Sequence, residues 1–223
     1  MSDNPPSSNQ SQQLTIGTYA GILGLILTPV LMIVAYYMEP TYQPVLQTIS
    51  KLGITPNGEY VFVLSTIVGG SSLIVFHYFS YKEKALTNTT LHQARLFGII
   101  SGFGLIGVGV VQDYPDLIHQ IPHWLSAFVF FLLTFLFIVY FCKFLKENNN
   151  KQNFRLTYNL AYLAEFLAIS YLLTSIFTQK LTLFMIDFKL HVIWQKLTVV
   201  SYLIWYLVLF YDSNKNKTVF LLE

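Results

Sequence analysis

Charged residues are scarce in this chain of 223 residues: Lys, Arg, Asp and Glu make up 11% of it, whereas 54% of the residues are hydrophobic. Soluble domains usually carry about 25% charged residues, so much of the surface of this protein does not face water. The formal net charge of +2 is small and spread along the chain, which argues against a nucleic-acid-binding protein. The single cysteine, Cys142, excludes an intrachain disulfide and a metal site built from several thiolates.

Polar segments are confined to the two ends of the chain and to the short connections between apolar runs. Residues 1–13 are rich in Ser, Asn, Gln and Pro, which predicts a disordered tail. Residues 213–223 are predicted to form a second short tail. The intervening residues, 14–212, are therefore predicted to form one membrane domain.

The chain contains instead six apolar runs of about 20 residues, the length with which an α-helix crosses a bilayer core of about 30 Å. They lie near residues 15–38, 60–80, 94–112, 121–143, 156–177 and 191–211. Because an open sheet cannot satisfy its backbone groups in lipid, each run is predicted to be a helix. The predicted fold class is all-α, a polytopic bundle of six transmembrane helices.

The distribution of Lys and Arg predicts the orientation of this bundle. Six spans place both termini and two connecting loops on one side, which carries nine basic residues: Lys82, Lys84, Arg95, Lys143, Lys146, Lys151, Arg155, Lys215 and Lys217. The other side carries three, namely Lys51, Lys180 and Lys189. Since basic residues favour the cytoplasmic side, both termini and both tails are predicted to be cytoplasmic, in a multi-pass protein of the cell membrane.

Two further patterns predict local structure. In the first outer loop, residues 42–53 carry apolar residues at helical spacing, which predicts a short amphipathic helix. Small residues occur at Ser65, Gly69 and Ser72 of the second span and at Gly98 and Gly102 of the third. Because small residues let transmembrane helices approach closely, these two spans are predicted to form a tight pair.

The densest group of titratable residues lies between the third and fourth spans and comprises Asp113, Asp116, His119 and His123. Asp113 and His123 are the first candidates of this group, ahead of Asp116 and His119. Pro122 favours a fourth helix that starts near Ile121 or Pro122, which leaves His119 outside the helix. Three interpretations stay open: capping and interfacial hydrogen bonds, a polar site for protons or lipid headgroups, and a divalent metal site that also uses His191 or Asp187.

Polar residues inside the spans are further candidates. Glu165 lies about ten residues into the fifth span and is expected in the bundle interior, where the hydroxyl of Tyr158 or Tyr162 donates to it. A proton or cation relay is the alternative role for Glu165. Lys196 is expected to extend to the outer interface without pairing with Glu165, and His77 is expected at the cytoplasmic interface. The polar stripe of the sixth span consists of His191, Gln195, Thr198, Tyr202 and Trp205.

Three short elements carry a resemblance to a known family: Ser50-Lys51-Leu52-Gly53, then Gly109 through Asp113-Tyr114-Pro115, then His123 with Ala127. In this order they resemble an archaeal and bacterial family of six-span membrane proteins known only as a domain of unknown function. The chain is also distantly similar to the FRAG, DRAM and Sfk group. The family pattern usually has an acid where this chain has Lys51. The resemblance implies a shared fold and an outer polar face, but no reaction.

The leading functional hypothesis is a membrane protein with an outward-facing polar pocket that binds lipid headgroups or supports another membrane component. The candidate pocket residues are Asp113, His123, Asp116, His119, Ser50 and His191. One alternative is a hydrolase at the outer leaflet that uses a metal-activated water and an Asp base. The other is a proton-linked transporter that uses Glu165. No cofactor is expected apart from the divalent metal of the hydrolase. Membrane lipids are the expected partners, with a membrane protein or a second copy of the chain as alternatives.

Overall fold

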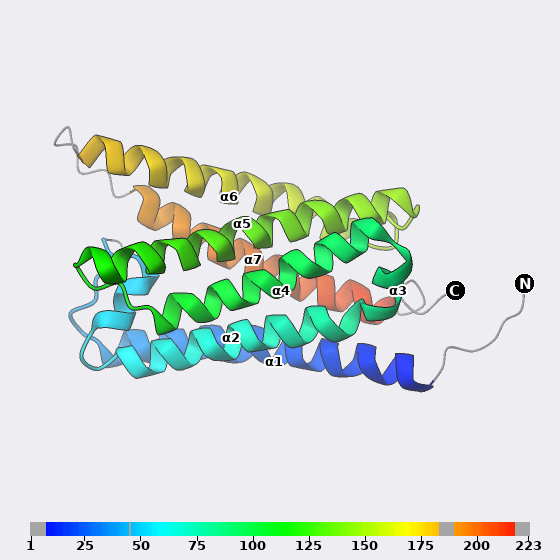
Figure 1. Ribbon diagram of the computed structural model, residues 1–223, viewed down its shortest axis with the longest axis horizontal. Helices are drawn as coiled ribbons and strands as arrows, with labels where there is room; N and C mark the ends of the chain where they lie inside the picture. Colours follow the sequence, from blue (N-terminus) through cyan, green and yellow to red (C-terminus); the bar gives the residue numbers. More distant parts are fainter. Residues whose placement is uncertain (1–7, 45, 183–189, 217–223) are drawn as a thin grey trace, which may run out of the picture.

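Long helices make up most of the protein (Figure 1). The computed structural model describes residues 8–44, 46–182 and 190–216. The elements there are α1 (Ser8–Met38), the 3₁₀ helix η1 (Ile49–Ile54), α2 (Glu59–Ser80), α3 (Lys82–Thr87), α4 (Thr89–Val110), α5 (Leu117–Glu147), α6 (Arg155–Thr182) and α7 (Leu190–Lys215). Within these ranges six helices, all except η1 and α3, are long and apolar enough to cross a membrane. The prediction of an all-α bundle with six such helices is confirmed.

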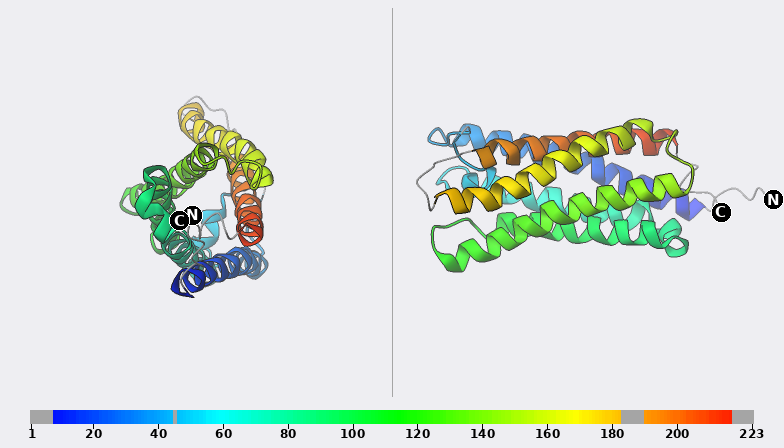
Figure 2. Two further views of the ribbon diagram at one scale, coloured as in Figure 1. Left: turned by 90° about the vertical axis from the view of Figure 1, so that its right-hand side faces the viewer. Right: turned by 90° about the horizontal axis from the view of Figure 1, so that it is seen from above.

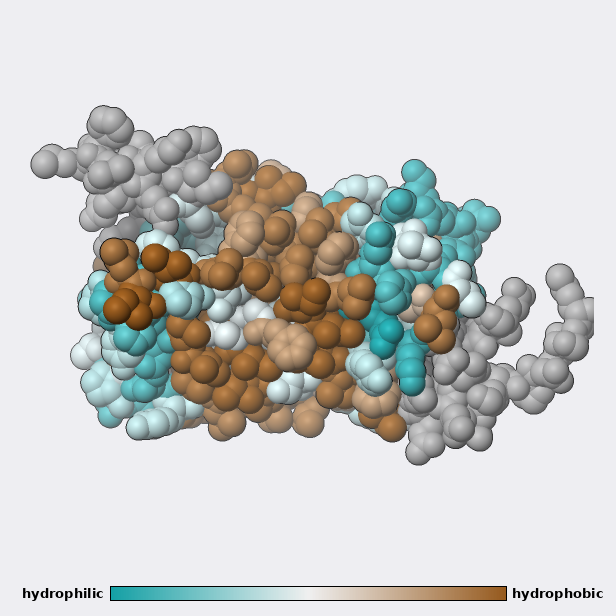
Figure 3. Space-filling model, in the orientation of Figure 1, coloured by the Kyte–Doolittle hydropathy of each residue, from teal (hydrophilic) through white to brown (hydrophobic). Residues whose placement is uncertain are grey.

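The bundle has two different ends (Figures 1 and 2). We call one the terminal end, because α1 begins and α7 ends there, next to α3 and the turn from α5 to α6. We call the other the loop end, because it holds η1 and the turn from α4 to α5. On the face shown in Figure 3, hydrophobic residues cover the middle of the molecule and hydrophilic residues gather toward both ends. That distribution suits a protein whose middle lies in the hydrocarbon core of a bilayer.

The predicted tails are described only in part. α1 begins at Ser8, so residues 8–13 continue the first helix. α7 runs on to Lys215, past the predicted boundary of the membrane domain at residue 212. Residues 1–7 and 217–223 lie outside the described ranges.

α5 begins earlier than the sequence predicts, at Leu117 instead of near Pro122. Asp116 starts the helix, because its carboxylate accepts a hydrogen bond from the backbone N–H of His119 at 3.0 Å. Pro122 lies inside the helix, and because proline has no backbone N–H, the helix loses one backbone hydrogen bond near its exposed first turns. The cap formed by Asp116 offsets this loss. His119 and His123 therefore share one helix, contrary to prediction.

The first outer loop does not form the predicted amphipathic helix, since within residues 42–53 only the short η1 begins. The hydroxyl of Tyr42 donates to the carbonyl oxygens of Gln47 (3.2 Å) and Thr48 (3.1 Å). The ammonium of Lys196, on α7, donates to the carbonyl oxygen of Gln47 at 2.8 Å. These side chains engage the carbonyl groups that a longer helix would use for its own hydrogen bonds.

Glycine brings α2 and α4 together, which confirms the predicted tight pair. A Cβ atom added to Gly102 would lie 2.7 Å from the carbonyl oxygen of Gly70, so the two backbones are in contact. Of the small residues predicted for this pair, Ser65 contacts α1 instead, whereas Gly69 lies against both α1 and α4. The hydroxyl of Ser65 donates to the carbonyl oxygen of Thr28 at 2.9 Å, and a Cβ at Gly69 would meet the Thr28 hydroxyl.

Aromatic side chains fill the interior of the bundle toward the terminal end. The rings of Phe137 and Trp205 are fully buried, with centroids 5.5 Å apart. His77 lies in the same core, where its Nε2 is 3.0 Å from the hydroxyl oxygen of Tyr206. The prediction of an interfacial His77 is therefore wrong. The physical reason is Gly98, whose missing side chain leaves the space that the imidazole occupies.

Candidate functional site

Asp113 and His123, the first candidates of their group, each have another partner. The Asp113 carboxylate pairs with the ammonium of Lys51 at 2.9 Å, and Lys51 also donates to the backbone carbonyl of Asp113 at 3.1 Å. The Nδ1 atom of His123 donates to the backbone carbonyl oxygen of Val111 at 2.6 Å. Asp113 and His123 are both buried. The two contacts fasten η1 and the start of α5 to the segment that follows α4.

Asp116 and His119 form a separate, exposed pair. The Nδ1 atom of His119 lies 2.8 Å from each carboxylate oxygen of Asp116, and both side chains are 51% exposed. The hydrogen bonds from His119 hold the pKa of Asp116 below its ordinary value. This geometry matches the predicted capping and interfacial hydrogen bonds.

The ligands of the predicted metal site are not gathered in the described part of the chain. No group of three or more His, Cys, Asp or Glu side chains there is placed to hold a metal ion. Asp187, one of the predicted ligands, lies outside the described ranges. His191 has a buried Nδ1 atom without a hydrogen-bond partner among the described residues. The described residues alone therefore form no assembled site for the metal-assisted hydrolase.

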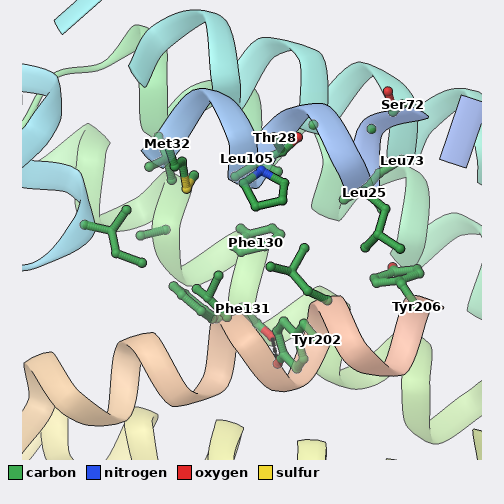
Figure 4. A pocket seen from close by; sticks show the side chains of 18 of the residues that line it. Leu25, Thr28, Met32, Ser72, Leu73, Leu105, Phe130, Phe131, Tyr202 and Tyr206 are labelled. Atoms are coloured by element: carbon green, nitrogen blue, oxygen red, sulfur yellow. Dashed lines mark hydrogen bonds between the residues drawn. The ribbon is translucent and has the colours of Figure 1, made fainter. Parts of the chain in front are cut away.

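An elongated cavity of about 120 Å³ lies between α1, η1, α2, α4, α5 and α7 (Figure 4). It extends along the bundle, since its lining on α7 runs from Gln195 to Phe210. Of the predicted site residues, Ser50 and His123 line it, whereas the others do not: Asp113, Asp116, His119, His191 and Glu165. The cavity thus brings together two residues from separate elements that the sequence placed in one polar site.

Three polar side chains line the loop end of the cavity, next to apolar ones such as Phe62. Ser50 on η1, His123 on α5 and Gln195 on α7 line it there. Because Nδ1 of His123 donates to a carbonyl oxygen, the Nε2 atom of the neutral ring is the acceptor. Gln195 accepts from the backbone N–H of Ile49 at 3.0 Å, which ties α7 to η1. A hydroxyl, an imidazole and an amide therefore lie at one end of the cavity.

Farther from the loop end the cavity is mainly apolar. Leu25, Leu105, Phe130 and Phe131 lie along its walls (Figure 4). The hydroxyl of Tyr202 donates to the carbonyl oxygen of Phe131 at 3.0 Å, so this tyrosine is already satisfied. Hydrocarbon and aromatic surface dominates the lining from there toward the terminal end.

A lysine holds the loop beside η1 in place. Lys196 donates to the carbonyl oxygens of Pro44 and Gln47, and its Nζ atom lies 5.7 Å from the ring centroid of Tyr42. Burial raises the pKa of Tyr42 to about 12. The ammonium of Lys196 therefore reaches the loop end of the bundle, and it makes no ion pair with Glu165 among the described residues, as predicted. It secures the loop that continues into η1.

Glu165 lies apart from the cavity, half-buried in a groove between α5 and α6. The predicted tyrosine donor is wrong, because the hydroxyl of Tyr162 donates to that of Tyr158 at 3.2 Å. Tyr162 is 61% exposed, so its side chain is directed outward. Glu165 makes no hydrogen bond or ion pair with any described residue.

Two residues of the site were missed by the sequence reasoning. Gln195 belongs to the polar stripe of α7, and this stripe was the signal that it faces the interior. Lys51 was recognised as a departure from the family pattern, yet nothing in the sequence indicated Asp113 as its partner. Lining residues such as Leu105 and Phe130 carry no signal of their own, because apolar residues occur on every face of a transmembrane helix.

Comparison with known families gives a match over most of the chain. A family described as protein of unknown function (DUF998) matches residues 22–212, which include part or all of each of the six long helices. Comparison with curated proteins and with solved structures found no match. The matched region covers far more than half of the sequence, and the chain belongs to the DUF998 family of proteins of unknown function.

Proposed function

We propose that this protein holds a hydrocarbon chain of a membrane lipid in the cavity, with the polar group of the lipid at the loop end. One observation carries the proposal: the cavity is mainly apolar, yet Ser50, His123 and Gln195 gather at one end of it. A lipid has the same division into a polar end and an apolar chain. This proposal retains the predicted headgroup binding. It differs for Asp113, whose ion pair with Lys51 holds the loop at the site.

The size of the cavity limits what it holds. An engineered protein cavity of about 150 Å³ binds one benzene molecule. A cavity of about 120 Å³ therefore takes a short stretch of hydrocarbon chain, not a whole lipid. α1 packs much more extensively on α2 than on α7, so the seam between α1 and α7 is the proposed path for the chain.

The hydrophobic effect supplies little of the affinity in this proposal, because a chain that leaves the bilayer was already surrounded by hydrocarbon. Favourable packing against rings such as Phe130 contributes instead. Selectivity then depends on the polar end, where His123 and Gln195 offer an acceptor and an amide. A lipid headgroup with hydrogen-bond donors suits the acceptor of His123.

The orientation and location of the protein form part of the proposal. The excess of basic residues supports cytoplasmic termini. In the proposed orientation, the loop end and the polar end of the cavity lie on the outer side of the cell membrane. We also propose the distant relationship to the FRAG, DRAM and Sfk group, on the short elements around Ser50 and His123. A protein that binds lipid in this way can also support another membrane component.

Photolabelling tests this proposal. The purified chain is irradiated with a phospholipid that carries a diazirine near the middle of one acyl chain, and the labelled residues are mapped by mass spectrometry. We expect label on cavity residues such as Leu105 and Phe130. Ala127→Phe fills the cavity and should remove most of that label, at least about fivefold, because the cavity admits only a small group.

The matched control is Leu125→Phe, two residues away on α5, where the side chain is 60% exposed on the outside of the bundle. This variant should keep the cavity label. Label confined to exposed residues in the wild-type chain, or equal loss in both variants, would contradict chain binding in the cavity. A melting curve for each variant shows that both are folded.

A further inference from the structure

A second hollow lies outside the cavity, between the last turns of α5 and the first turns of α6. This α5–α6 groove has a volume of about 250 Å³ and is lined on α5 by Val139, Lys143 and Lys146, and on α6 by Tyr158, Ala161 and Glu165. It exists because α6 packs mainly on α7 and only lightly on α5. None of these six residues lines the central cavity.

The groove carries positive charge at the terminal end of the bundle. Lys143 and Lys146 are exposed near the end of α5. The ammonium of Lys143 is 3.8 Å from the carboxylate of Glu147, a solvent-exposed pair of the kind that contributes little to stability. Lys146 has no ion-pair partner among the described residues. Both ammonium groups are therefore accessible to an anion at the level where phosphates of a bilayer lie.

Glu165 adds a group deeper in the same groove. It is ten residues beyond Arg155, at the start of α6, and at 1.5 Å per residue this places it about 15 Å along the helix. Side chains on a helix lean toward its N-terminus, so the carboxyl of Glu165 leans toward the end with the lysines. A carboxyl at this depth is costly unless it finds a hydrogen-bond partner, and the described residues supply none.

We propose that the α5–α6 groove binds one anionic phospholipid. Its phosphate lies at the ammonium groups of Lys143 and Lys146, one acyl chain follows Val139 and Ala161, and the protonated carboxyl of Glu165 donates to an ester carbonyl. The order of these groups, cationic at the rim and hydrogen-bonding farther in, matches the order of phosphate and ester along a phospholipid. This site is separate from the cavity, so either proposal can fail without the other.

Native mass spectrometry of the full chain tests the proposal by titration with phosphatidylglycerol or phosphatidylcholine that have the same acyl chains. We expect tighter binding of phosphatidylglycerol by about tenfold or more, because each basic residue near an anionic lipid surface favours binding by about fivefold. The Lys143→Gln/Lys146→Gln variant should abolish this preference. The control Lys82→Gln/Lys215→Gln removes the same charge at the same end from residues that do not line the groove, and should change affinity by about twofold or less.

Glu165 has a different expected signature, since both lipids contain ester carbonyls. Glu165→Leu should weaken both lipids by about fivefold, whereas Glu165→Gln keeps a donor and should bind both nearly as well as wild type. No preference for phosphatidylglycerol in the wild-type chain, or equal losses in the two lysine variants, would overturn the proposal in favour of unspecific surface charge. Unchanged affinities in Glu165→Leu would overturn the groove as the location.

Discussion

The two ends of the bundle are held together in different ways. Toward the terminal end, large rings such as Phe137 and Trp205 are fully buried, and polar groups beside them make hydrogen bonds within the core. The indole N–H of Trp205 donates to the carbonyl oxygen of Thr157 at 2.9 Å, and the Thr157 hydroxyl donates to Asp212 at 2.6 Å. At the loop end, the buried cluster is small and the cavity lies beside it.

Single polar contacts hold the loop end instead. Lys51 joins η1 to Asp113, and Gln195 and Lys196 join α7 to the segment before and within η1. Because lipid tails are as apolar as the helices, association inside a membrane depends on close packing, and the terminal end has more of it. The difference indicates that the terminal end is rigid. At the loop end, single contacts can open one at a time, as the proposed lipid site requires.

The largest effect should come from emptying the aromatic core. Phe137→Ala removes a fully buried ring and should lower the free energy of unfolding by about 3 kcal/mol, because the packed neighbours cannot fill the space. Phe130→Ala removes the same ring from the wall of an existing cavity and should cost about 1 kcal/mol. Unfolding in detergent micelles, followed by tryptophan fluorescence, measures both values.

These two variants are each other's control, since both shorten Phe to Ala on α5. Equal losses of stability would contradict the difference between the two ends, because the loop half of the bundle would then be packed as closely as the terminal half. A larger loss for Phe130→Ala would show that the cavity wall, not the aromatic core, carries the stability.

A smaller effect should distinguish backbone contact from side-chain contact along α4. Gly102→Ala places a methyl group 2.7 Å from the carbonyl oxygen of Gly70, which is fixed in α2. Gly107→Ala places one 2.6 Å from the hydroxyl of Ser126, which can rotate away, and 2.9 Å from the Cβ of Ser126, which moves only by a small shift of α5. We expect a loss of about 1–3 kcal/mol for Gly102→Ala and a smaller loss for Gly107→Ala.

Melting temperatures in the same detergent compare the two glycine variants. Alanine is favoured over glycine inside a helix by about 1 kcal/mol, which offsets part of the cost at both positions equally. Similar melting temperatures for the two variants would mean that α2 and α4 separate without cost, and would contradict the tight pair.

The sequence predicted the scaffold well because membrane spans are defined by length and hydropathy. Six helices follow from six apolar runs, and the close approach of α2 and α4 follows from their glycines. Residues that combine an aromatic ring with polar atoms were harder to place. His77 reads as an interfacial residue beside Tyr78, yet the space at Gly98, on another helix, takes its ring into the core.

The site was predictable only in part, because its contacts join residues far apart in the sequence. Ser50 and His123 were candidates and do line one cavity, whereas the candidate Asp113 does not line it and pairs with Lys51. A backbone carbonyl, that of Val111, satisfies His123, and a sequence does not show which carbonyl is free. The cavity is the space that side chains of several helices leave unfilled. No single residue type in the sequence indicates such a space.

The smallest effect should come from an exposed contact of the loop end, the pair of Asp116 and His119. Because the pKa of Asp116 is held below its ordinary value of 3.8, the carboxylate stabilises the folded chain at higher pH, and this stabilisation is lost as the pH falls through the lowered pKa. Asp116→Asn keeps a capping side chain but does not titrate, so its melting temperature near neutral pH should stay close to that of wild type. Between pH 6 and pH 3 the wild-type melting temperature should fall slightly more steeply than that of the variant. All other carboxylates are present in both proteins, so they contribute equally to the two curves. Parallel curves would show that the pair contributes nothing, whereas a steep difference would make the loop end more dependent on this one contact than its exposure predicts.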